Sequence, residues 1–431
     1  MRTLLLSALL ACSAHAENWP QWRGPRTDGT SLDKGFPVKI EEANTVWRTT
    51  LPGEGHASPI VWNNRVFVVA CLDDSQDRVL LTLDRANGKI LWQRAVVHSP
   101  IERIHKLNSH ASSTPATDGQ RIYTSFLDQS ETEQTREANT LHPPQSGDAP
   151  KGTVVISAHD FEGRQVWQVR PGLFSSKHGY CSSPVLYKDK VIINCDHDGD
   201  GFMVALARDT GRELWRIKRP NNTRSYCVPL IRTLAGRDQM VLSGTKCITS
   251  YDPNTGALIW EIDGPTEQFV ASLVYSDSTG WLYMTGGFPE HHFMAIRPDG
   301  NGNVTQTHVQ WHTNKGVSYV PSPLVLGDRL FNVSDSGIGH CFDAKTGDVL
   351  WTERMKEHHA SLTSAEGIVY FVNDFGTLRA VKDGPQYECV GQSEISEKIF
   401  ASPALSDGQL FVRGEKTLMC VGRKPASVAA H

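Results

Sequence analysis

A tripartite unit that recurs along the chain constrains the fold more than any other feature of the sequence. Each copy has a small-residue segment ending in Ser-Pro or a variant, then a β-branched hairpin, then a Gly-containing turn before a strand that carries Trp. In the first copy these parts are residues 58–62, 66–69 and 84–92. Later copies end in Trp167, Trp215, Trp260, Trp311 and Trp351. Each unit has room for four short strands, which is the size of one propeller blade.

The last two copies are degenerate. The seventh, residues 361–391, keeps the hairpins and has Cys389 where Trp is expected. The eighth, which ends near Cys420, supplies only three strands, and the missing Trp strand lies near the start of the chain around Trp47. Pairing that strand with the C-terminal three closes a ring and removes exposed edges. We therefore predict an all-β fold, an eight-bladed β-propeller of four-stranded blades whose last blade is closed by an N-terminal strand. Seven blades is the alternative if the degenerate copies merge.

Burial gives the repeat its physical reason. A four-stranded blade cannot cover both of its faces alone, so neighbouring blades must stack. In the Asp-x-x-Gly turns Gly takes the positive-φ position, and Asp bonds to the backbone just ahead of it. The recurring Trp offers a large apolar surface, and we expect it to pack between blades.

The first residues have the pattern of a targeting segment. Arg2 is followed by a short apolar run over residues 4–11, and Ala14-His15-Ala16 has the small-x-small form of a cleavage site. We predict a signal peptide over residues 1–16, an N-terminal extension over 17–43, the propeller over 44–424 and a C-terminal tail over 425–431. The predicted location is therefore the periplasm or cell envelope, after export. In an alternative interpretation Leu10-Ala11-Cys12 is a lipoprotein signal and Cys12 carries a lipid anchor.

Composition narrows the class of partner. The 431 residues carry a formal net charge of -4, so the chain has no net positive electrostatic field that would attract nucleic acid. After the first residues, no apolar run is long enough to span a bilayer. Eight cysteines follow Cys12, and a chain of this size does not need disulfides to hold its core.

The repeats resemble the PQQ-type propeller repeat, whose core reads Ala-x-Asp-x-x-Thr-Gly-Lys-x-x-Trp. Residues 342–351 are the best single match, and residues 19–25 resemble the segment that precedes such propellers in quinoprotein dehydrogenases and their non-enzymatic relatives. The resemblance covers nearly the whole chain after the signal. It implies the fold strongly and the chemistry weakly, because the repeat is a packing motif.

Three branches of this superfamily bear on function. Quinoprotein dehydrogenases bind PQQ and calcium in the central channel, whereas the outer-membrane β-barrel assembly scaffold is a propeller lipoprotein that binds partner proteins without a cofactor. A third branch comprises single-domain exported propellers of unassigned role, and the chain resembles these most. It lacks the adjacent cysteines and the cytochrome domain of the dehydrogenase branch. The resemblance thus implies a binding or scaffold protein for envelope proteins or a small polar ligand. The alternative is a PQQ-dependent oxidoreductase acting on an alcohol or sugar.

Propeller geometry indicates where a ligand site lies. If the strand after Ser-Pro is innermost, the segments leading into it share one face with the loops between second and third strands, and many histidines fall there. His56 and His359 occupy the same repeat position, three residues before Pro59 and Leu362, and other blades place Cys181, Tyr226 and Phe400 there. We predict a pocket at this channel mouth for an anionic or sugar-like ligand. One alternative is a metal site held by imidazoles, and the other is a loop face that is polar but binds nothing. The candidate ligand-binding residues are His56, His110, His178, Cys181, Arg224, Tyr226, Tyr319, His358, His359 and Lys398. No catalytic residue is predicted.

Asp196, Asp198 and Asp200 are candidate metal ligands, because they begin a D-x-D-x-D-G run of the kind that opens calcium loops. Against this, Val204 and Ala207 stand at positions nine and 12 of the loop. An acidic hairpin turn is the alternative. The polar insertion at residues 128–152 is interpreted as a surface loop, with a cap over the channel as the alternative.

Overall fold

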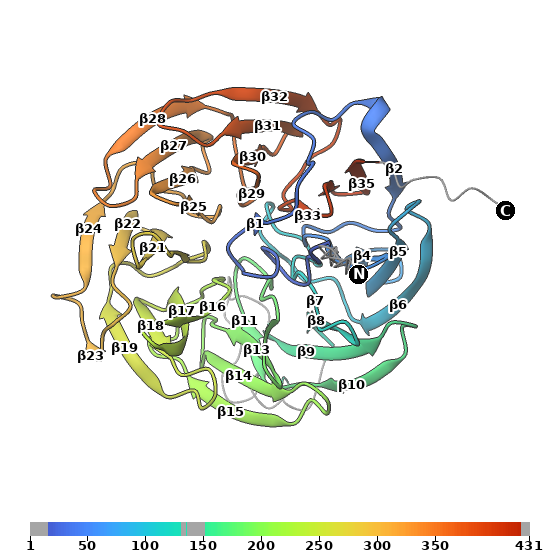
Figure 1. The fold of residues 1–431 in the computed structure, drawn as a ribbon. Helices are drawn as coiled ribbons and strands as arrows, with labels where there is room; N and C mark the ends of the chain where they lie inside the picture. Colours follow the sequence, from blue (N-terminus) through green and yellow to red (C-terminus); the bar gives the residue numbers. More distant parts are fainter. Residues whose placement is uncertain (1–15, 131–134, 136–150, 424–431) are drawn as a thin grey trace, which may run out of the picture.

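The computed structural model describes residues 16–130, 135 and 151–423 and is nearly all β, with one 3-10 helix at Glu42–Asn44. Eight sheets stand around a ring, which confirms the predicted eight-bladed propeller (Figure 1). The signal peptide, Cys12, the C-terminal tail and most of the insertion lie outside the described residues.

Each blade runs outward from a short inner strand. Blades 1 and 2 contain β3 (Ile60–Trp62), β4 (Arg65–Leu72), β5 (Asp77–Asp84) and β6 (Ile90–His98), then β7 (Ala116–Thr117), β8 (Arg121–Asp128), β9 (Lys151–Asp160), β10 (Gln165–Val169) and β11 (Leu173–Ser175). Blades 3 and 4 contain β12 (Val185–Tyr187), β13 (Lys190–Cys195), β14 (Phe202–Ala207) and β15 (Glu213–Lys218), then β16 (Leu230–Leu234), β17 (Arg237–Gly244), β18 (Cys247–Tyr251) and β19 (Leu258–Asp263), with β23 (Gly302–Asn303) added.

The second half of the ring repeats this order. Blades 5 and 6 contain β20 (Val274–Ser276), β21 (Trp281–Gly286), β22 (His292–Ile296) and β24 (Val309–Thr313), then β25 (Leu324–Leu326), β26 (Arg329–Val333), β27 (Ile338–Asp343) and β28 (Val349–Arg354). Blade 7 contains β29 (Thr363–Ala365), β30 (Ile368–Val372), β31 (Thr377–Lys382) and β32 (Cys389–Glu394), with β1 (Thr30–Ser31) parallel to β29. Blade 8 contains β33 (Ala404–Ser406), β34 (Gln409–Arg413), β35 (Thr417–Gly422) and β2 (Thr45–Thr50).

The ring closes as the sequence predicts. Strand β2, from near the start of the chain, pairs antiparallel with β35, and Trp47 lies opposite Cys420. Blade 8 therefore has four strands, and β35 keeps no free edge.

Tryptophan and glycine join neighbouring blades. The Trp47 indole of blade 8 donates to the carbonyl of Arg85, in the turn between β5 and β6 of blade 1, at 2.7 Å, and its ring lies against Gly88 of that turn. Gly88 has φ +73°, and a Cβ there would come within 2.5 Å of the Trp47 ring. The same Trp-to-turn hydrogen bond recurs at four more junctions, from Trp92, Trp167, Trp215 and Trp311. The turn glycine thus serves both the backbone conformation and the close approach of the ring.

Serine and threonine hydroxyls join the inner strands around the channel. At most junctions the residue just before the Pro or Leu of the Ser-Pro position donates its backbone N–H to the hydroxyl of the corresponding residue in the next blade. Ser58 N–H donates to Thr114 Oγ1 at 2.9 Å, and Ser272 N–H donates to Ser322 Oγ at 2.9 Å. The bond is present at six junctions, and at a seventh position Val228 has no hydroxyl to accept one. The recurring Ser therefore acts as a link between blades.

Blade 7 corrects one sequence-based prediction. In blade 6 the outer strand has a one-residue register shift, and the residue paired next to the shift is Trp351, opposite Cys341. Blade 7 has the same shift, and the residue paired next to it is Gly391, opposite Ala380. Gly391, and not Cys389, therefore occupies the Trp position. The N-terminal segment fills the vacated space, because a Cβ on Gly391 would lie 2.0 Å from the carbonyl oxygen of Val38.

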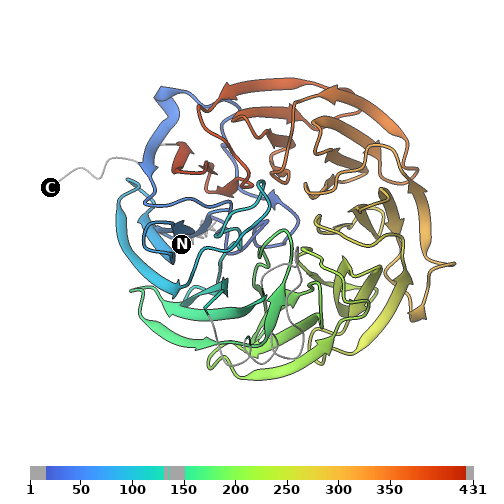
Figure 2. The same ribbon diagram turned by 180° about the vertical axis from the view of Figure 1, so that it is seen from behind.

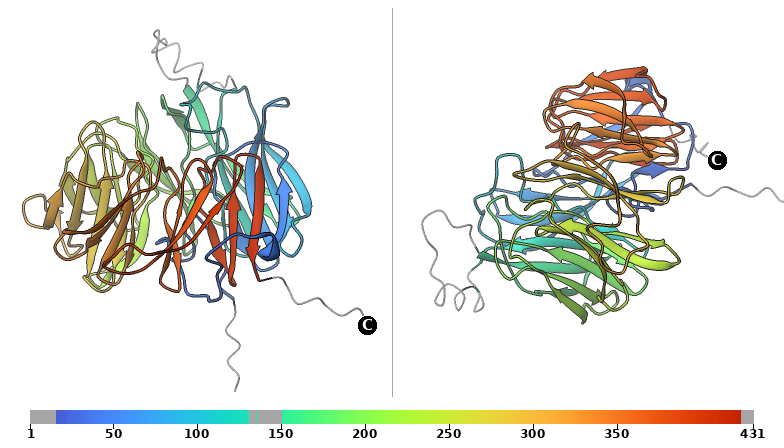
Figure 3. Two further views of the ribbon diagram at one scale, coloured as in Figure 1. Left: turned by 90° about the horizontal axis from the view of Figure 1, so that it is seen from above. Right: turned by 90° about the vertical axis from the view of Figure 1, so that its left-hand side faces the viewer.

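The N-terminal segment crosses the end of the channel on the side of the Asp-x-x-Gly turns. Trp19 forms a bridge with Val61 of blade 1, the Arg23 guanidinium donates to Pro323 O of blade 6 at 2.6 Å, and Thr30 pairs with Ser364 of blade 7. In Figure 1 this segment, in blue, runs into the centre of the ring, and in the left view of Figure 3 it lies at the lower edge. Within the described residues no helix has the length and apolar character needed to cross a membrane.

Candidate ligand-binding site

A cavity of about 840 Å³ opens on the other face of the ring. Its walls come from the segments that lead into the inner strands and from loops between second and third strands, as the sequence argument expects; Figure 2 shows the ring from behind. Since the N-terminal segment covers the far end of the channel, ligands have access from this face.

One repeat position supplies a complete ring of lining residues. All eight residues that stand three positions before the Pro or Leu of the inner-strand segment line the cavity. They are His56, Ser112, Cys181, Tyr226, Val270, Val320, His359 and Phe400. Repeat geometry explains this, because equivalent residues of stacked blades point toward one axis. The ring is mainly apolar and aromatic, which suits a binding pocket with few oriented polar groups.

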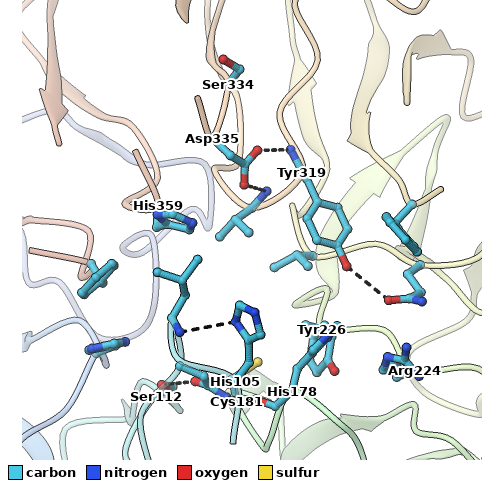
Figure 4. A pocket seen from close by; sticks show the side chains of 18 of the residues that line it. His105, Ser112, His178, Cys181, Arg224, Tyr226, Tyr319, Ser334, Asp335 and His359 are labelled. Atoms are coloured by element: carbon cyan, nitrogen blue, oxygen red, sulfur yellow. Dashed lines mark hydrogen bonds between the residues drawn. The ribbon is translucent and has the colours of Figure 1, made fainter. Parts of the chain in front are cut away.

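Asp335, in the loop between β26 and β27, is the one carboxylate in the described lining (Figure 4). Its oxygens accept the backbone N–H groups of Tyr319, at 2.6 Å, and Val320, at 3.0 Å. Burial raises the pKa of Asp335, and these backbone hydrogen bonds oppose the shift. The carboxylate thus holds the Tyr319 segment in place.

Arg224 is the one arginine in the described lining of the cavity. It pairs with Asp198 at 2.5 Å, while its Nε is buried without a hydrogen-bond partner. Tyr226 and Tyr319 lie in the same wall, and desolvation raises the pKa of Tyr319 to about 12. An unpartnered buried donor favours a ligand that brings an acceptor.

His56 and His359 flank Phe400 and differ in electrostatics. Their ring centroids lie 4.3 and 5.7 Å from that of Phe400. Burial lowers the pKa of His56, with the nearby Glu415 opposing. Burial also disfavours charge on His359, but its Nδ1 lies 2.6 Å from Asp374, and that carboxylate with others nearby raises the pKa of His359 overall. His359 is therefore the imidazole that favours an anion.

Seven of the ten candidate ligand-binding residues lie in the cavity wall, and three do not. Those in the wall are His56, His178, Cys181, Arg224, Tyr226, Tyr319 and His359. His358 is buried beside Phe371 with Nδ1 2.6 Å from Lys356 O, and Lys398 is exposed outside the lining. His110 lies behind the wall, with Nε2 2.8 Å from Glu102 O. Neighbours in sequence thus point to different sides of the segment.

Sequence reasoning missed several lining residues. Ser112, Val270 and Val320 follow from the same three-residue offset that singled out His56, had it been applied to every blade. Gln268 lies in the segment that leads into β20, two residues before Val270, whereas Phe288 and Asp335 come from loops of unequal length between second and third strands, which carry no repeat signal.

Comparison with known proteins agrees with this architecture. A family model described as outer membrane protein assembly factor BamB matches residues 36–132, 149–353 and 335–424. The chain belongs to this family. The family assignment confirms the expected PQQ-like propeller.

Individual relatives match more distantly. BamB from Shewanella oneidensis is 23% identical over 221 residues, 49% of this chain and 53% of the relative. Lanthanide-dependent methanol dehydrogenase from Methylacidiphilum fumariolicum is 26% identical over 166 residues, 36% of this chain and 24% of the enzyme. The chain thus spans about half, or less, of these curated relatives. The crystal structure of BamB from Moraxella catarrhalis has a TM-score of 0.59 at 13% identity, covering 90% of this chain and 98% of that one, and shares the fold.

The acidic run of blade 3 does not converge on one point. Asp196 is fully buried in an ion pair with Arg219, 2.9 Å from its Nε, Asp198 pairs with Arg224, and Asp200 is exposed. Within the described chain these three carboxylates form no common ligand group, so the geometry favours the acidic-turn interpretation.

The cavity is a poor fit for the quinone cofactor of the wider superfamily. Calcium takes six to eight oxygen ligands, and PQQ itself carries three carboxylates. In the described lining the single carboxylate, Asp335, already accepts two backbone N–H groups. The single guanidinium, Arg224, is paired with Asp198 through Nη1 and keeps an unpartnered Nε for at most one of the three PQQ carboxylates. The eight cysteines of the described chain are free, and no two are adjacent. These residues do not fit PQQ with calcium.

Proposed function

We propose that this chain is an exported binding protein of the periplasm or cell envelope that takes part of its partner into the cavity of the histidine-bearing face. The single observation that carries the proposal is the ring of eight equivalent residues around a cavity of about 840 Å³. Family membership and the targeting pattern of residues 1–16 support the location, with a lipid anchor at Cys12 as the variant form.

The lining defines the chemistry of the partner. The free Nε of Arg224 and the His359 imidazole, whose raised pKa favours its protonated form, suit a carboxylate. The rings of Tyr226, Tyr319 and Phe400 suit an aromatic or apolar body. Leu107 and Phe288 in the lining are exposed large hydrophobic residues. An apolar rim around a polar-tipped cavity favours a segment of an envelope protein over an isolated small polar ligand.

Binding fits the cavity better than catalysis. Burial raises the pKa of Cys181 to about 12, so its thiol is protonated at neutral pH and is a weak nucleophile. Asp335 is occupied by backbone N–H groups, and His359 by Asp374. Among the described lining residues no hydroxyl or thiol is hydrogen-bonded to an imidazole, the general base that activates such nucleophiles in Ser–His and Cys–His pairs.

The test is binding of capped, fluorescein-labelled tetrapeptides that carry one Glu and one Tyr, with Gln replacing Glu in the control peptides. We expect the Glu peptides to bind more tightly, and Arg224→Gln to weaken them about tenfold or more, the size of a charge-assisted hydrogen bond. Arg212→Gln, an exposed change on the opposite face, serves as the matched variant and should have no effect.

Equal binding of Glu and Gln peptides, or an unaffected Arg224→Gln, would remove the proposal. Binding of a free sugar acid but of no peptide would assign the site to a small ligand. If the protein reduced a dye with one of a panel of alcohols after addition of PQQ and calcium, the proposed binding function would be rejected in favour of the alternative, a quinoprotein oxidoreductase.

A further inference from the structure

A group of three side chains with metal-binding chemistry lies outside the cavity lining. Cys71 is the next-to-last residue of β4, the second strand of blade 1, just before the turn that carries Asp73, and His110 comes from the segment that leads into blade 2. One ligand atom from each lies within 4.8 Å of the others, and no other such group of three occurs in the described residues. We propose that Cys71, Asp73 and His110 form a site for a thiolate-preferring divalent cation, with Zn²⁺ as the best-matched ion.

The ligand set suits Zn²⁺. Sulfur, imidazole nitrogen and carboxylate oxygen are its three usual protein ligands, at about 2.0–2.3 Å, which spaces tetrahedral ligands about 3.3–3.8 Å apart. The separations between the three atoms, which are at most 4.8 Å, therefore need to shorten by no more than about 1–1.5 Å, which side-chain rotation supplies. Three protein ligands leave a fourth position for water.

His110 is already oriented in the way that metal-binding imidazoles are. Its Nε2 lies 2.8 Å from the carbonyl oxygen of Glu102, which only accepts, so Nε2 carries the proton and Nδ1 keeps a lone pair. The Glu102 carboxylate is in turn paired with the buried Arg78, which also donates to Ser99 O. The backbone carbonyl that orients the imidazole is thus itself fixed.

Cys71 is 3% exposed, so a thiolate–metal bond formed there is shielded from solvent. Binding converts Cys71–SH and M²⁺ into a Cys71 thiolate–metal bond and one proton released to solvent.

The position of the site gives it a structural consequence. His110 is two residues from Ser112, and His105, Leu107 and Asn108 of the same segment line the cavity. A metal held by Cys71, Asp73 and His110 would fasten this wall to blade 1. The inference does not depend on what the cavity binds.

The test is titration of the metal-stripped, full-length mature protein with Co²⁺, whose thiolate complexes give an intense near-ultraviolet charge-transfer band. We expect one equivalent to produce the band, with release of one proton in weak buffer. Cys71→Ser should abolish it, whereas Cys389→Ser, which removes the exposed thiol, should leave it unchanged. His110→Gln should weaken Co²⁺ binding about 10- to 100-fold.

Three outcomes would overturn the site: no band at one equivalent, a band that persists in Cys71→Ser, or a band lost only in Cys389→Ser. Cobalt bound without the band would point instead to imidazoles alone, such as the stacked His292 and His312, and would equally reject the proposal. If Cys71→Ser does not fold, competition between wild type or His110→Gln and a chromophoric chelator for Zn²⁺ decides, and equal Zn²⁺ affinities reject the site.

Discussion

His56 and His359 show how one repeat position acquires two electrostatic characters. Both stand three residues before the inner strand and both contact Phe400. Only His359 has a carboxylate, Asp374, within hydrogen-bonding distance at 2.6 Å, since the Glu415 carboxylate is 3.7 Å from His56. The difference arises outside the repeat position, in the loops that supply the partners.

The first prediction follows from this pair. In an NMR titration of the imidazole protons, His359 should titrate above the usual value near 6.5 and His56 below it. Asp374→Asn should lower the pKa of His359, because it removes the carboxylate that stabilises the imidazolium. Asp200→Asn, an exposed carboxylate on another blade, should leave it unchanged. An Asp374→Asn curve identical to wild type would show that the ion pair is absent in solution.

The sign for stability follows from the raised folded-state pKa. The His359–Asp374 pair stabilises the fold fully below the unfolded-state pKa, and this contribution is lost as the pH rises through the folded-state pKa. Thermal unfolding of wild type and Asp374→Asn should therefore differ more below pH 6.5 than well above the His359 pKa.

At the scale of elements, the Trp–Gly contact between blades governs packing. Gly88 and Gly236 both have positive φ, +73° and +79°, but only Gly88 faces a Trp ring. A Cβ on Gly236 meets nothing within 4 Å. The two positions therefore separate backbone strain from steric overlap.

The second prediction compares alanine at these two glycines. Gly236→Ala should lower the free energy of unfolding by about 1–2 kcal/mol, because an L-residue is strained in the left-handed conformation. Gly88→Ala should lower it by about 1–3 kcal/mol more, because the Trp47 ring must also move away. Calorimetric melting of both variants measures the difference, and equal melting temperatures would show that the ring adapts freely.

The third prediction concerns the exception in blade 7. Gly391→Ala should loosen the N-terminal segment, because the added methyl group would lie 2.0 Å from Val38 O. Trypsin should then cut faster after Lys34 and Lys39. Gly384→Ala is the control and should be cut like wild type, because the added methyl group would lie 3.8 Å from its nearest neighbour, Gln386 O.

The same elements show what a single sequence contains. The eight blades and the pairing of Trp47 with Cys420 follow from a repeat that stays recognisable even in its degenerate copies. The sequence places the Trp position of blade 7 at Cys389 because a degenerate turn hides the register, and the strand pairing of Gly391 with Ala380 corrects it. The lining residues of the cavity show the same contrast. Those at the repeat position can be predicted from the sequence, whereas Asp335 cannot, because it lies in a loop whose length differs between blades and is held there by tertiary contacts.

At the scale of the whole molecule, the N-terminal region has two separable tasks. Residues 17–39 cover the far end of the channel through contacts such as Arg23 to Pro323 O and Thr30 to Ser364. Strand β2 instead completes blade 8, and its Trp47 joins that blade to blade 1. Removing one should leave the other intact.

The last prediction tests this separation with two truncations of the mature chain. A variant beginning at residue 40 keeps β2 and should elute in size-exclusion chromatography like the untruncated mature chain but melt at a lower temperature, because it loses the contacts across the channel. A variant beginning at residue 52 lacks β2, so β35 becomes an unpaired edge and the Trp47 contact with Gly88 is gone. Since an exposed strand edge templates association, this second variant should lose its cooperative melting transition and elute as aggregates in size-exclusion chromatography. Two monomeric truncations with the same melting temperature would mean that blade 8 is stable with three strands, and that ring closure by β2 adds little to the stability of the propeller.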